Sequence, residues 1–251
     1  MLERACGFES HPGHHNQTFR NFPDRFGRAK RAVSPARKRF GFYQTNILFT
    51  VMKYEFIAVD IQNEFAAKGG KFYSPKPSIV FLNKTLFPFF KKHTIKINEI
   101  ISDYRQPRPG DGGDGCYPGE WGYQSLIPDN LRKSLWIKCM NSPIWIRKYI
   151  GIKSKKPGLP YPDSNAFGKW IEKNIGKPNE IIPVIFGLTI DCCVLSVIQE
   201  FKWRGFKSII IKEAIDHASG KEKDKNAVLN KTAINWWAKV MKWNEFIKTI
   251  K

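Results

Sequence analysis

The sequence predicts an α/β protein with three layers, in which helices cover both faces of a mainly parallel, Rossmann-like sheet. From residue 52 onward, short apolar runs typical of buried strands alternate with helical patterns. This alternation implies right-handed crossovers between parallel strands. The chain has 251 residues with 42% hydrophobic content, which is enough for one sizeable core. No apolar stretch in the sequence approaches the roughly 18 residues of a membrane span.

The strands and helices are expected in a regular order along the chain. Apolar runs predict five strands, at 56–61, 97–104, 134–140, 181–187 and 206–214. Helical spacing predicts helices at 77–93, 164–176 and 193–205, and the last two end at a glycine. Pro88 is expected to kink or end the first helix because it has no N–H to donate. The long loop 105–130, rich in glycine and proline, is typical of a functional or mobile segment.

The first 51 residues differ from the rest of the chain in composition. Their positive charge is mostly arginine, whereas lysine dominates after Met52, and they show no sustained hydrophobic period. We therefore expect one domain at 52–251, preceded by a basic, disordered extension at 1–51. An upstream start, a basic tail and a transit-like segment are three explanations for this extension.

The charge and the cysteine content indicate which binding partners and which cellular location to expect for the protein. The net charge is +20, but the lysines after Met52 are scattered, which is typical of a solvated basic surface rather than a nucleic-acid-binding stripe. We therefore expect neither nucleic acid nor a membrane as a partner. The five scattered cysteines form no disulfide framework, so we expect a reducing, cytoplasmic location.

Three chemically active side chains are expected at one edge of the sheet. Asp60 ends the first predicted strand, Lys138 lies near the end of the third, and Cys193 follows the fourth where a helix begins. Sites of parallel sheets gather at the carboxyl ends of strands. A helix N-terminus and a lysine favour the thiolate, and a carboxylate accepts the thiol proton. Packing of Cys193 as a small buried residue remains the alternative.

Four segments carry motifs in a distinctive combination. They are "AVDIQNEF", "PGEWGYQSLIP", "WIKCMNS" and "GLTIDCCVLSVIQEF". Together they resemble the isochorismatase-like cysteine hydrolases, a superfamily that includes nicotinamidases and N-carbamoyl amidases. The first is similar to that family's D-x-Q-x-x-F motif, and the last to its G-x-x-T-D-x-C-V segment, with Ile190-Asp191 in place of Thr-Asp. The resemblance covers nearly all of 54–220.

The resemblance implies a role for each residue of the predicted site. Asp60 would be the general base, Lys138 would stabilise the thiolate and the developing charge, and Cys193 would be the nucleophile. A cis peptide at Leu188–Thr189 would aim the backbone N–H groups of Thr189 and Cys193 at the substrate oxygen, as an oxyanion hole. Attack on a carbonyl or amide carbon would give a thioester that water then releases. In this scheme Cys192 packs and does not react.

No metal and no other cofactor is expected. The resemblance places a metal-binding Asp-x-His motif where this sequence has Asp103-Tyr104-Arg105, and zinc needs three or more suitable ligands. Arg105 is a candidate to hold a substrate carboxylate, although an arginine at a strand end more often pairs with a nearby aspartate. Phe65 and Trp121 are candidates for the substrate-binding walls. Packing as an apolar cap (Phe65) or as a loop anchor (Trp121) is the alternative for each.

We therefore expect a metal-independent cysteine hydrolase that cleaves a C–N bond of a small amide or ureido compound. Members of the superfamily usually associate, and the aromatic tail 235–248 is expected to pack as a final helix or strand or to bury a contact in a homo-oligomer. Two other functions stay open. One is a non-catalytic binding or scaffold protein with a basic surface, and the other is vinyl-ether hydrolysis of the isochorismatase type, which the presence of Cys193 disfavours.

Overall fold

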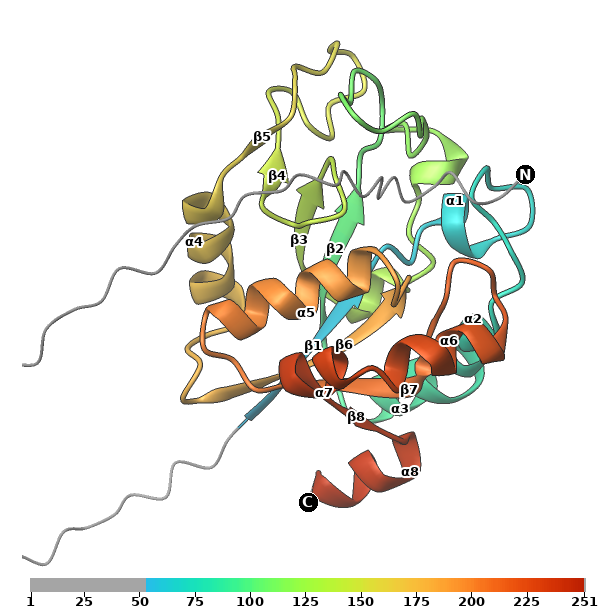
Figure 1. The fold of residues 1–251 in the computed structure, drawn as a ribbon, viewed down its shortest axis with the longest axis vertical. Coiled ribbons are helices and arrows are strands. Elements are labelled where there is room, and N and C mark those ends of the chain that lie inside the picture. The colour runs from blue at the N-terminus through green and yellow to red at the C-terminus, as the bar shows by residue number, and fades with distance from the viewer. Residues whose placement is uncertain (1–52, 251) are drawn as a thin grey trace, which may run out of the picture. The chain divides into compact units, whose positions relative to one another are not determined.

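A computed structural model of the protein describes residues 53–250, which form a six-stranded sheet with helices packed on it (Figure 1). The strand order is β3-β2-β1-β6-β7-β8, and all neighbouring strands are parallel. The strands are β1 (Lys53–Val59), β2 (Ile97–Ser102), β3 (Arg132–Lys138), β6 (Ile181–Leu188), β7 (Ser208–Asp216) and β8 (Ala238–Met241). This arrangement confirms the predicted parallel α/β fold. A separate antiparallel pair, β4 (Trp145–Ile146) and β5 (Tyr161–Pro162), was not predicted.

The helices lie between and after the strands in the order that the sequence predicts. The longest are α4 (Ser164–Asn174) and α5 (Cys193–Trp203), which correspond to the predicted helices at 164–176 and 193–205. The others are α1 (Asn63–Ala66), α2 (Pro77–Phe81), η1 (Leu82–Leu86), α3 (Phe87–Lys92), η2 (Trp121–Tyr123), η3 (Asp129–Leu131), α6 (Glu222–Leu229), α7 (Thr232–Trp237), α8 (Trp243–Phe246) and η4 (Ile247–Thr249). The aromatic tail therefore supplies a sixth strand, β8, between two short helices.

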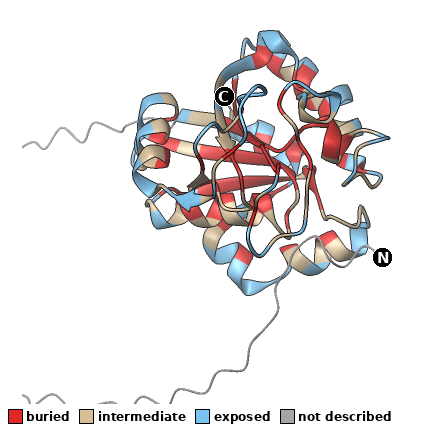
Figure 2. Ribbon diagram, turned by 90° about the horizontal axis from the view of Figure 1, so that it is seen from above, coloured by how far each residue is buried: buried red, intermediate tan, exposed pale blue. Residues whose placement is uncertain are grey.

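Aromatic side chains join the helices to both faces of the sheet. On one face, Trp136 of β3 packs against Phe167 of α4, which in turn contacts Phe201 of α5. Phe56 of β1 packs instead against Phe90 of α3 and Phe246 of α8. Figure 2 shows that the buried residues concentrate in the sheet between these helices. The three-layer prediction is confirmed by this packing.

The helical segment that contains Pro88 does not end at the proline. The elements α2, η1 and α3 follow one another directly, and η1 is a wide π-helical turn just before the proline. Pro88 is the second residue of α3 and directly follows this wide turn, in which the N–H of Phe87 donates to the carbonyl of Leu82, five residues earlier. The expected break is thus replaced by a local change in helix type.

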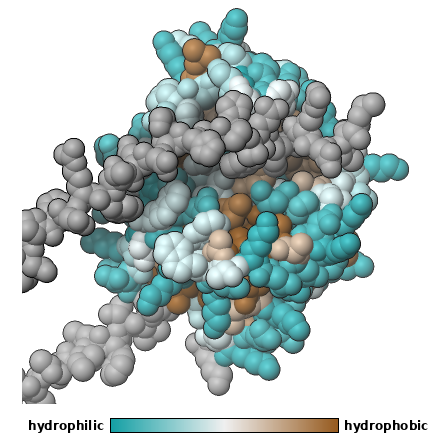
Figure 3. Space-filling view, in the orientation of Figure 1, coloured by the Kyte–Doolittle hydropathy of each residue, from teal (hydrophilic) through white to brown (hydrophobic). Residues whose placement is uncertain are grey.

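Residues 1–51, expected to be an extension, lie outside the described residues, so that domain boundary stays a prediction. Within residues 53–250 no helix is both long enough and apolar enough to cross a membrane. The face of the molecule seen in Figure 3 carries mostly hydrophilic side chains over the described part, with a smaller hydrophobic area near its centre.

Candidate active site

The three predicted catalytic residues meet at the carboxyl end of the sheet. Asp60 directly follows β1, Lys138 is the last residue of β3, and Cys193 is the first residue of α5, shortly after β6. Strand β1 has β2 on one side and β6 on the other. The strands before β6 are therefore added on one side of β1 and the later ones on its other side, so the strand order reverses at this point. Ligands of open α/β sheets bind at such a switch point.

Lys138 is fully buried, and its Nζ contacts the other groups of the site. Nζ lies 2.9 Å from Oδ2 of Asp60 and 3.3 Å from Sγ of Cys193. It also donates to the hydroxyl oxygens of Ser102 at 2.7 Å and Tyr104 at 2.8 Å. Burial lowers the pKa of Lys138, but the charges of Asp60 and Cys193 and the hydrogen bonds to both outweigh it, so the pKa is raised. Lys138 is therefore an ammonium ion at neutral pH.

Asp60 is a buried carboxylate whose two oxygens have different partners. Its backbone has φ of 51°, in the left-handed region that aspartate tolerates better than most residues. Oδ1 accepts a hydrogen bond of 2.8 Å from the hydroxyl of Ser102. Oδ2 forms the ion pair with Lys138 but no well-directed hydrogen bond to a described residue. No direct hydrogen bond joins Asp60 to Cys193, so Lys138 is the group that connects them.

Cys193 is 5% exposed, and its sulfur has three polar neighbours. Besides Nζ of Lys138, these are the hydroxyl of Tyr104 at 3.2 Å and Oδ1 of Asn141 at 3.7 Å. Cys192 is more exposed and packs with the partly buried residues around the core. The two adjacent cysteines therefore differ in burial, and Cys193 is the one whose sulfur lies 3.3 Å from Nζ of Lys138.

The turn before α5 positions Cys193 at the start of that helix. The peptide bond Leu188–Thr189 is cis, as the resemblance implies. The carbonyl of Thr189 accepts from the N–H groups of Cys192 at 3.1 Å and Val194 at 3.0 Å. Thr189 lies outside the strands and helices, and its N–H bonds no described backbone carbonyl. Its availability to a ligand fits the oxyanion role expected for Thr189 and Cys193, which stays a prediction.

Backbone and side-chain groups at the ends of β6 and β7 hold this turn from the other side. The N–H of Ile190 donates to the carbonyl of Asp216 at 2.9 Å, and Oδ1 of Asp191 accepts from the N–H of Ala218 at 3.0 Å. Oδ2 of Asp191 lies 3.4 Å from Nε2 of His217. His217 thus supports the turn through Asp191 instead of contacting the sulfur.

The two predicted substrate-binding aromatic residues occupy different positions. Phe65 of α1 packs its edge against the ring of Tyr104, with ring centroids 6.0 Å apart, and stacks on Phe72. Phe65 therefore lies beside Tyr104, whose hydroxyl contacts Sγ of Cys193. Trp121 is 48% exposed, and its backbone carbonyl anchors the loop by accepting from Nδ2 of Asn63. The binding roles of Phe65 and Trp121 stay predictions.

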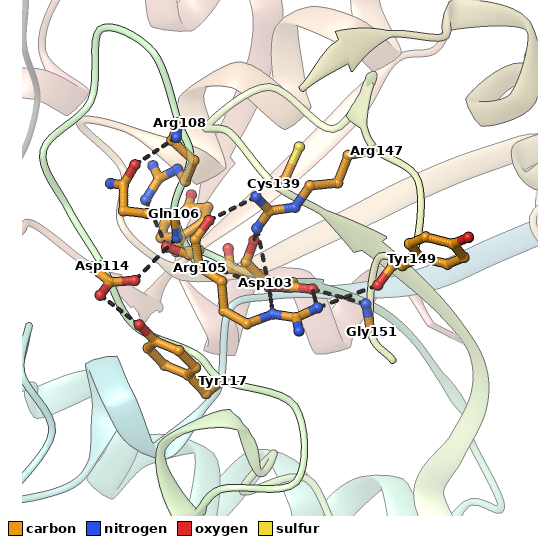
Figure 4. Close-up of polar contacts among 12 residues, drawn as sticks. Asp103, Arg105, Gln106, Arg108, Asp114, Tyr117, Cys139, Arg147, Tyr149 and Gly151 are labelled. Atoms are coloured by element: carbon orange, nitrogen blue, oxygen red, sulfur yellow. Dashed lines mark hydrogen bonds and ion pairs between the residues drawn. The ribbon is translucent and has the colours of Figure 1, made fainter. Parts of the chain in front are cut away.

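Arg105 is fully occupied by protein groups and is not free to bind a substrate carboxylate. Figure 4 shows its contacts with Asp103 and Tyr149. Nε and Nη2 donate to Asp103 at 2.9 and 2.6 Å. The remaining N–H groups donate to the carbonyls of Tyr149, Ile152 and Lys155. The substrate role expected for Arg105 is therefore corrected to the alternative interpretation, a pair with the neighbouring aspartate.

Asp103 lies where the resemblance places a metal ligand, but its surroundings do not fit a metal ion. Oδ1 accepts from Arg105 and, at 3.1 Å, from Nη2 of Arg147, and Oδ2 accepts from Arg105 and from the N–H of Gly151 at 2.8 Å. Burial raises the pKa of Asp103, but these hydrogen bonds and the two guanidinium charges outweigh it, so the pKa is lowered. Within residues 53–250, no cluster of three His, Cys, Asp or Glu side chains is placed to hold a metal.

Three further residues of the cluster, Ser102, Tyr104 and Asn141, were not predicted from the sequence. Residues at the end of β2 alternate between two sides. Ser102 and Tyr104 contact Lys138, whereas Asp103 and Arg105 contact each other on the opposite side. This alternation was the available signal for Ser102 and Tyr104. Asn141 lies beyond β3 in an irregular segment, for which the sequence contains no comparable pattern.

Known structures support the fold and no closer relation. No protein-family model matches the sequence, and no curated protein matches it. An isochorismatase-like hydrolase from Alkaliphilus metalliredigens has a TM-score of 0.54 at 15% identity, covering 80% of this chain and 97% of that one. A zinc complex of pyrazinamidase from Pyrococcus horikoshii has a TM-score of 0.55 at 14% identity, with coverage of 76% and 99%. N-carbamoylsarcosine amidase from Thermoplasma acidophilum has a TM-score of 0.51 at 17% identity, with coverage of 76% and 96%. The protein therefore has the fold of isochorismatase-like hydrolases.

Proposed function

We propose that this protein is a metal-independent cysteine hydrolase that cleaves the C–N bond of a small amide or ureido compound. One observation carries the proposal: the buried ammonium of Lys138 contacts both the carboxylate of Asp60 and the sulfur of Cys193. A cation held between a carboxylate and a thiol favours the thiolate, which is the nucleophilic form of cysteine. The amidases among the structures of similar fold support the choice of a C–N bond.

The proposed reaction has two halves that share the same groups. The thiol proton of Cys193 reaches Asp60 through Lys138, which gives one proton to the carboxylate and takes one from the sulfur. The thiolate then attacks the carbonyl carbon while the backbone N–H groups of Thr189 and Cys193 hold the oxyanion. The C–N bond then breaks, and the leaving nitrogen takes the proton from Asp60, which leaves a thioester on Cys193. Water attacks the thioester, Asp60 accepts the water proton, and that proton returns to the sulfur as the acid is released.

Metal independence rests on the groups around Asp103. Both oxygens of that carboxylate accept hydrogen bonds from guanidinium or backbone N–H groups, so a divalent cation would displace two buried positive charges. We therefore expect activity to withstand prolonged treatment with a chelator.

Site-resolved alkylation between pH 5 and 9, followed by peptide mass spectrometry, tests the proposal without a known substrate. We expect Cys193 to react at least about tenfold faster at pH 6 than an ordinary thiol, which is mostly protonated there. Cys116 and Cys139 are internal controls, because burial raises the pKa of Cys139 to about 11 and that of Cys116 well above its ordinary value. Asp60→Asn should remove the advantage of Cys193.

Ammonia release from a panel of small primary amides and carbamoyl compounds then identifies the reaction, with Cys193→Ala as the inactive control. A covalent adduct on Cys193 in mass spectra of the intact protein would identify the thioester. If Cys193 reacts no faster than Cys116 in the folded protein, the hydrolase proposal fails and a non-catalytic binding role takes its place.

A further inference from the structure

The hydroxyl group of Tyr104 contacts the proposed nucleophile and has no part in the mechanism described so far. It lies 3.2 Å from Sγ of Cys193 and 2.8 Å from Nζ of Lys138, and the tyrosine is 5% exposed. Tyr104 thus touches a reacting atom directly, whereas Asp60 reaches the sulfur only through Lys138.

The partners of this hydroxyl determine where its hydrogen points. An ammonium group only donates, so Lys138 Nζ supplies the hydrogen of the Lys138–Tyr104 bond and the tyrosine oxygen accepts it. The tyrosine's own hydrogen then has two acceptors within reach, Sγ of Cys193 at 3.2 Å and Oδ1 of Asn141 at 3.3 Å. A thiolate carries a full negative charge and is the stronger of these two acceptors.

The protein fixes this ring from several sides. The guanidinium carbon of Arg108 lies 3.8 Å from the ring centroid, and Phe65 meets the ring edge-on. The backbone of Tyr104 pairs with Gly115 through an N–H···O bond of 3.1 Å, and the neighbouring Asp103 N–H donates to the carbonyl of Lys138 at 2.8 Å. The hydroxyl is therefore held beside the sulfur before a substrate arrives, which is the condition for a preorganised donor.

From this geometry we infer that Tyr104 is a further catalytic residue, whose hydroxyl donates a hydrogen bond to the thiolate of Cys193. The inference rests on the proposed function, and it adds a second donor to the ammonium of Lys138. A hydrogen bond made to the charged form of a group favours that form. Burial and the charge of Cys193 raise the pKa of Tyr104 well above its ordinary value, so the hydroxyl keeps its hydrogen throughout the working pH range.

The charged and titratable groups around this contact come from every neighbouring segment. They are Asp60 after β1, Lys138 at the end of β3, Cys192 before α5, and Arg108 and Cys116 in the loop after β2. Tyr104→Phe changes none of them and removes one oxygen atom, so a change in the pH profile reports on the hydroxyl.

The test is the pH profile of Cys193 alkylation in the full-length protein and in Tyr104→Phe. We expect the half-maximal rate to move to a pH about one unit higher, and the rate at pH 6 to fall about tenfold, as the loss of a charge-assisted hydrogen bond implies. Tyr54→Phe is the matched control, because it removes a hydroxyl that bonds Thr249 outside the catalytic cluster. That control should leave the Cys193 profile unchanged.

A second variant distinguishes a hydrogen bond donated by the Tyr104 hydroxyl from a mere packing role of that residue. Asn141→Ala removes the competing acceptor, so the profile should stay where it is or move to lower pH, with unfolding midpoints of both variants recorded alongside. If Tyr104→Phe leaves a fast-reacting Cys193 unchanged, the inference fails while the hydrolase proposal stands. It also fails if Asn141→Ala raises the half-maximal pH as much as Tyr104→Phe does. A slow Cys193 in the unmodified protein would overturn both.

Discussion

Asp103 shows how a single residue can tie a sheet end to a distant loop. Its side chain is fully buried and accepts from Arg105, Arg147 and the N–H of Gly151. Removing one partner of a buried ion cluster leaves the remaining charges without compensation, which typically costs about 3–5 kcal/mol. The residue therefore matters for stability although it takes no part in the proposed chemistry.

We predict that Asp103→Asn lowers the free energy of unfolding at pH 7 by about 3 kcal/mol. The pKa of Asp103 is lowered in the folded protein, so its contribution is complete above the unfolded value of about 3.8 and is lost as the pH falls through the folded value. The difference between the unmodified protein and the variant should therefore shrink below about pH 4. Denaturant titrations at pH 3, 4, 5 and 7 measure it.

Asp129→Asn is the matched control for that prediction. The Asp129 side chain is 91% exposed and pairs with Arg132 at the surface, where such pairs contribute about 0–1 kcal/mol. A loss for Asp103→Asn no larger than that of the control, or one that grows towards acid pH, would contradict the prediction.

Among the secondary-structure elements, β6 depends on a close approach to β1. Gly187 has φ of +128°, and a Cβ added there would lie 2.1 Å from the carbonyl oxygen of Val59. This contact is with the backbone of Val59, which cannot move aside as a side chain can. The glycine thus lets β6 lie against β1 just before the turn that leads to Cys193.

We expect Gly187→Ala to destabilise the protein by about 2–4 kcal/mol, because a side chain there is strained and collides with β1. Gly168→Ala in α4 is the contrasting variant, since a Cβ there meets nothing within 4 Å. In a helix interior, alanine is favoured over glycine by about 0.5–1 kcal/mol, so this variant should be stabilised. Thermal or chemical unfolding measures the change in stability of each variant. If both variants gain stability, or both lose it, the prediction is contradicted.

The elements also show what the sequence could and could not predict. The five predicted strands and helices α4 and α5 are confirmed, because apolar runs and glycine stops are local signals. The strand ends followed from these elements, so Asp60, Lys138 and Cys193 were expected at one sheet edge, where they lie, whereas their catalytic roles stay predictions. Tyr104 was missed although the alternation at the end of β2 places it on the side of Lys138, whereas Asn141 lies in an irregular segment with no comparable pattern. The guanidinium of Arg105 donates hydrogen bonds to the carbonyls of residues 149, 152 and 155, and no local sequence pattern links these positions to residue 105.

At the scale of the whole molecule, all residues of the candidate site lie between Asp60 and Cys193. The described sheet begins with β1 at Lys53, and β1 pairs with both β2 and β6. The sequence places the start of the domain at 52, one residue before this central strand.

We predict that a chain beginning at Met52 folds and keeps the fast alkylation of Cys193. Its unfolding midpoint and the Cys193 rate at pH 6 should match those of the full-length chain. A chain that begins at Ala58 is the control, because it lacks most of β1 and should not fold. Loss of Cys193 reactivity in the Met52 chain would show that the proposed domain boundary is wrong.

The paired guanidinium groups on Asp103 also bear on how this fold can change its chemistry during evolution. Exchange of Arg105 for histidine alone would offer one imidazole to a metal, yet Arg147 would still place its charge on Asp103. Arg147 also donates to the carbonyls of Asp103, Arg105 and Pro107, so its loss would leave three acceptors without their donor. A path from this sequence to a metal-binding one therefore passes through intermediates that have lost the arginine pairs of Asp103 but do not yet bind a metal. Such a path requires several substitutions together, which makes the present arrangement hard to leave by single steps.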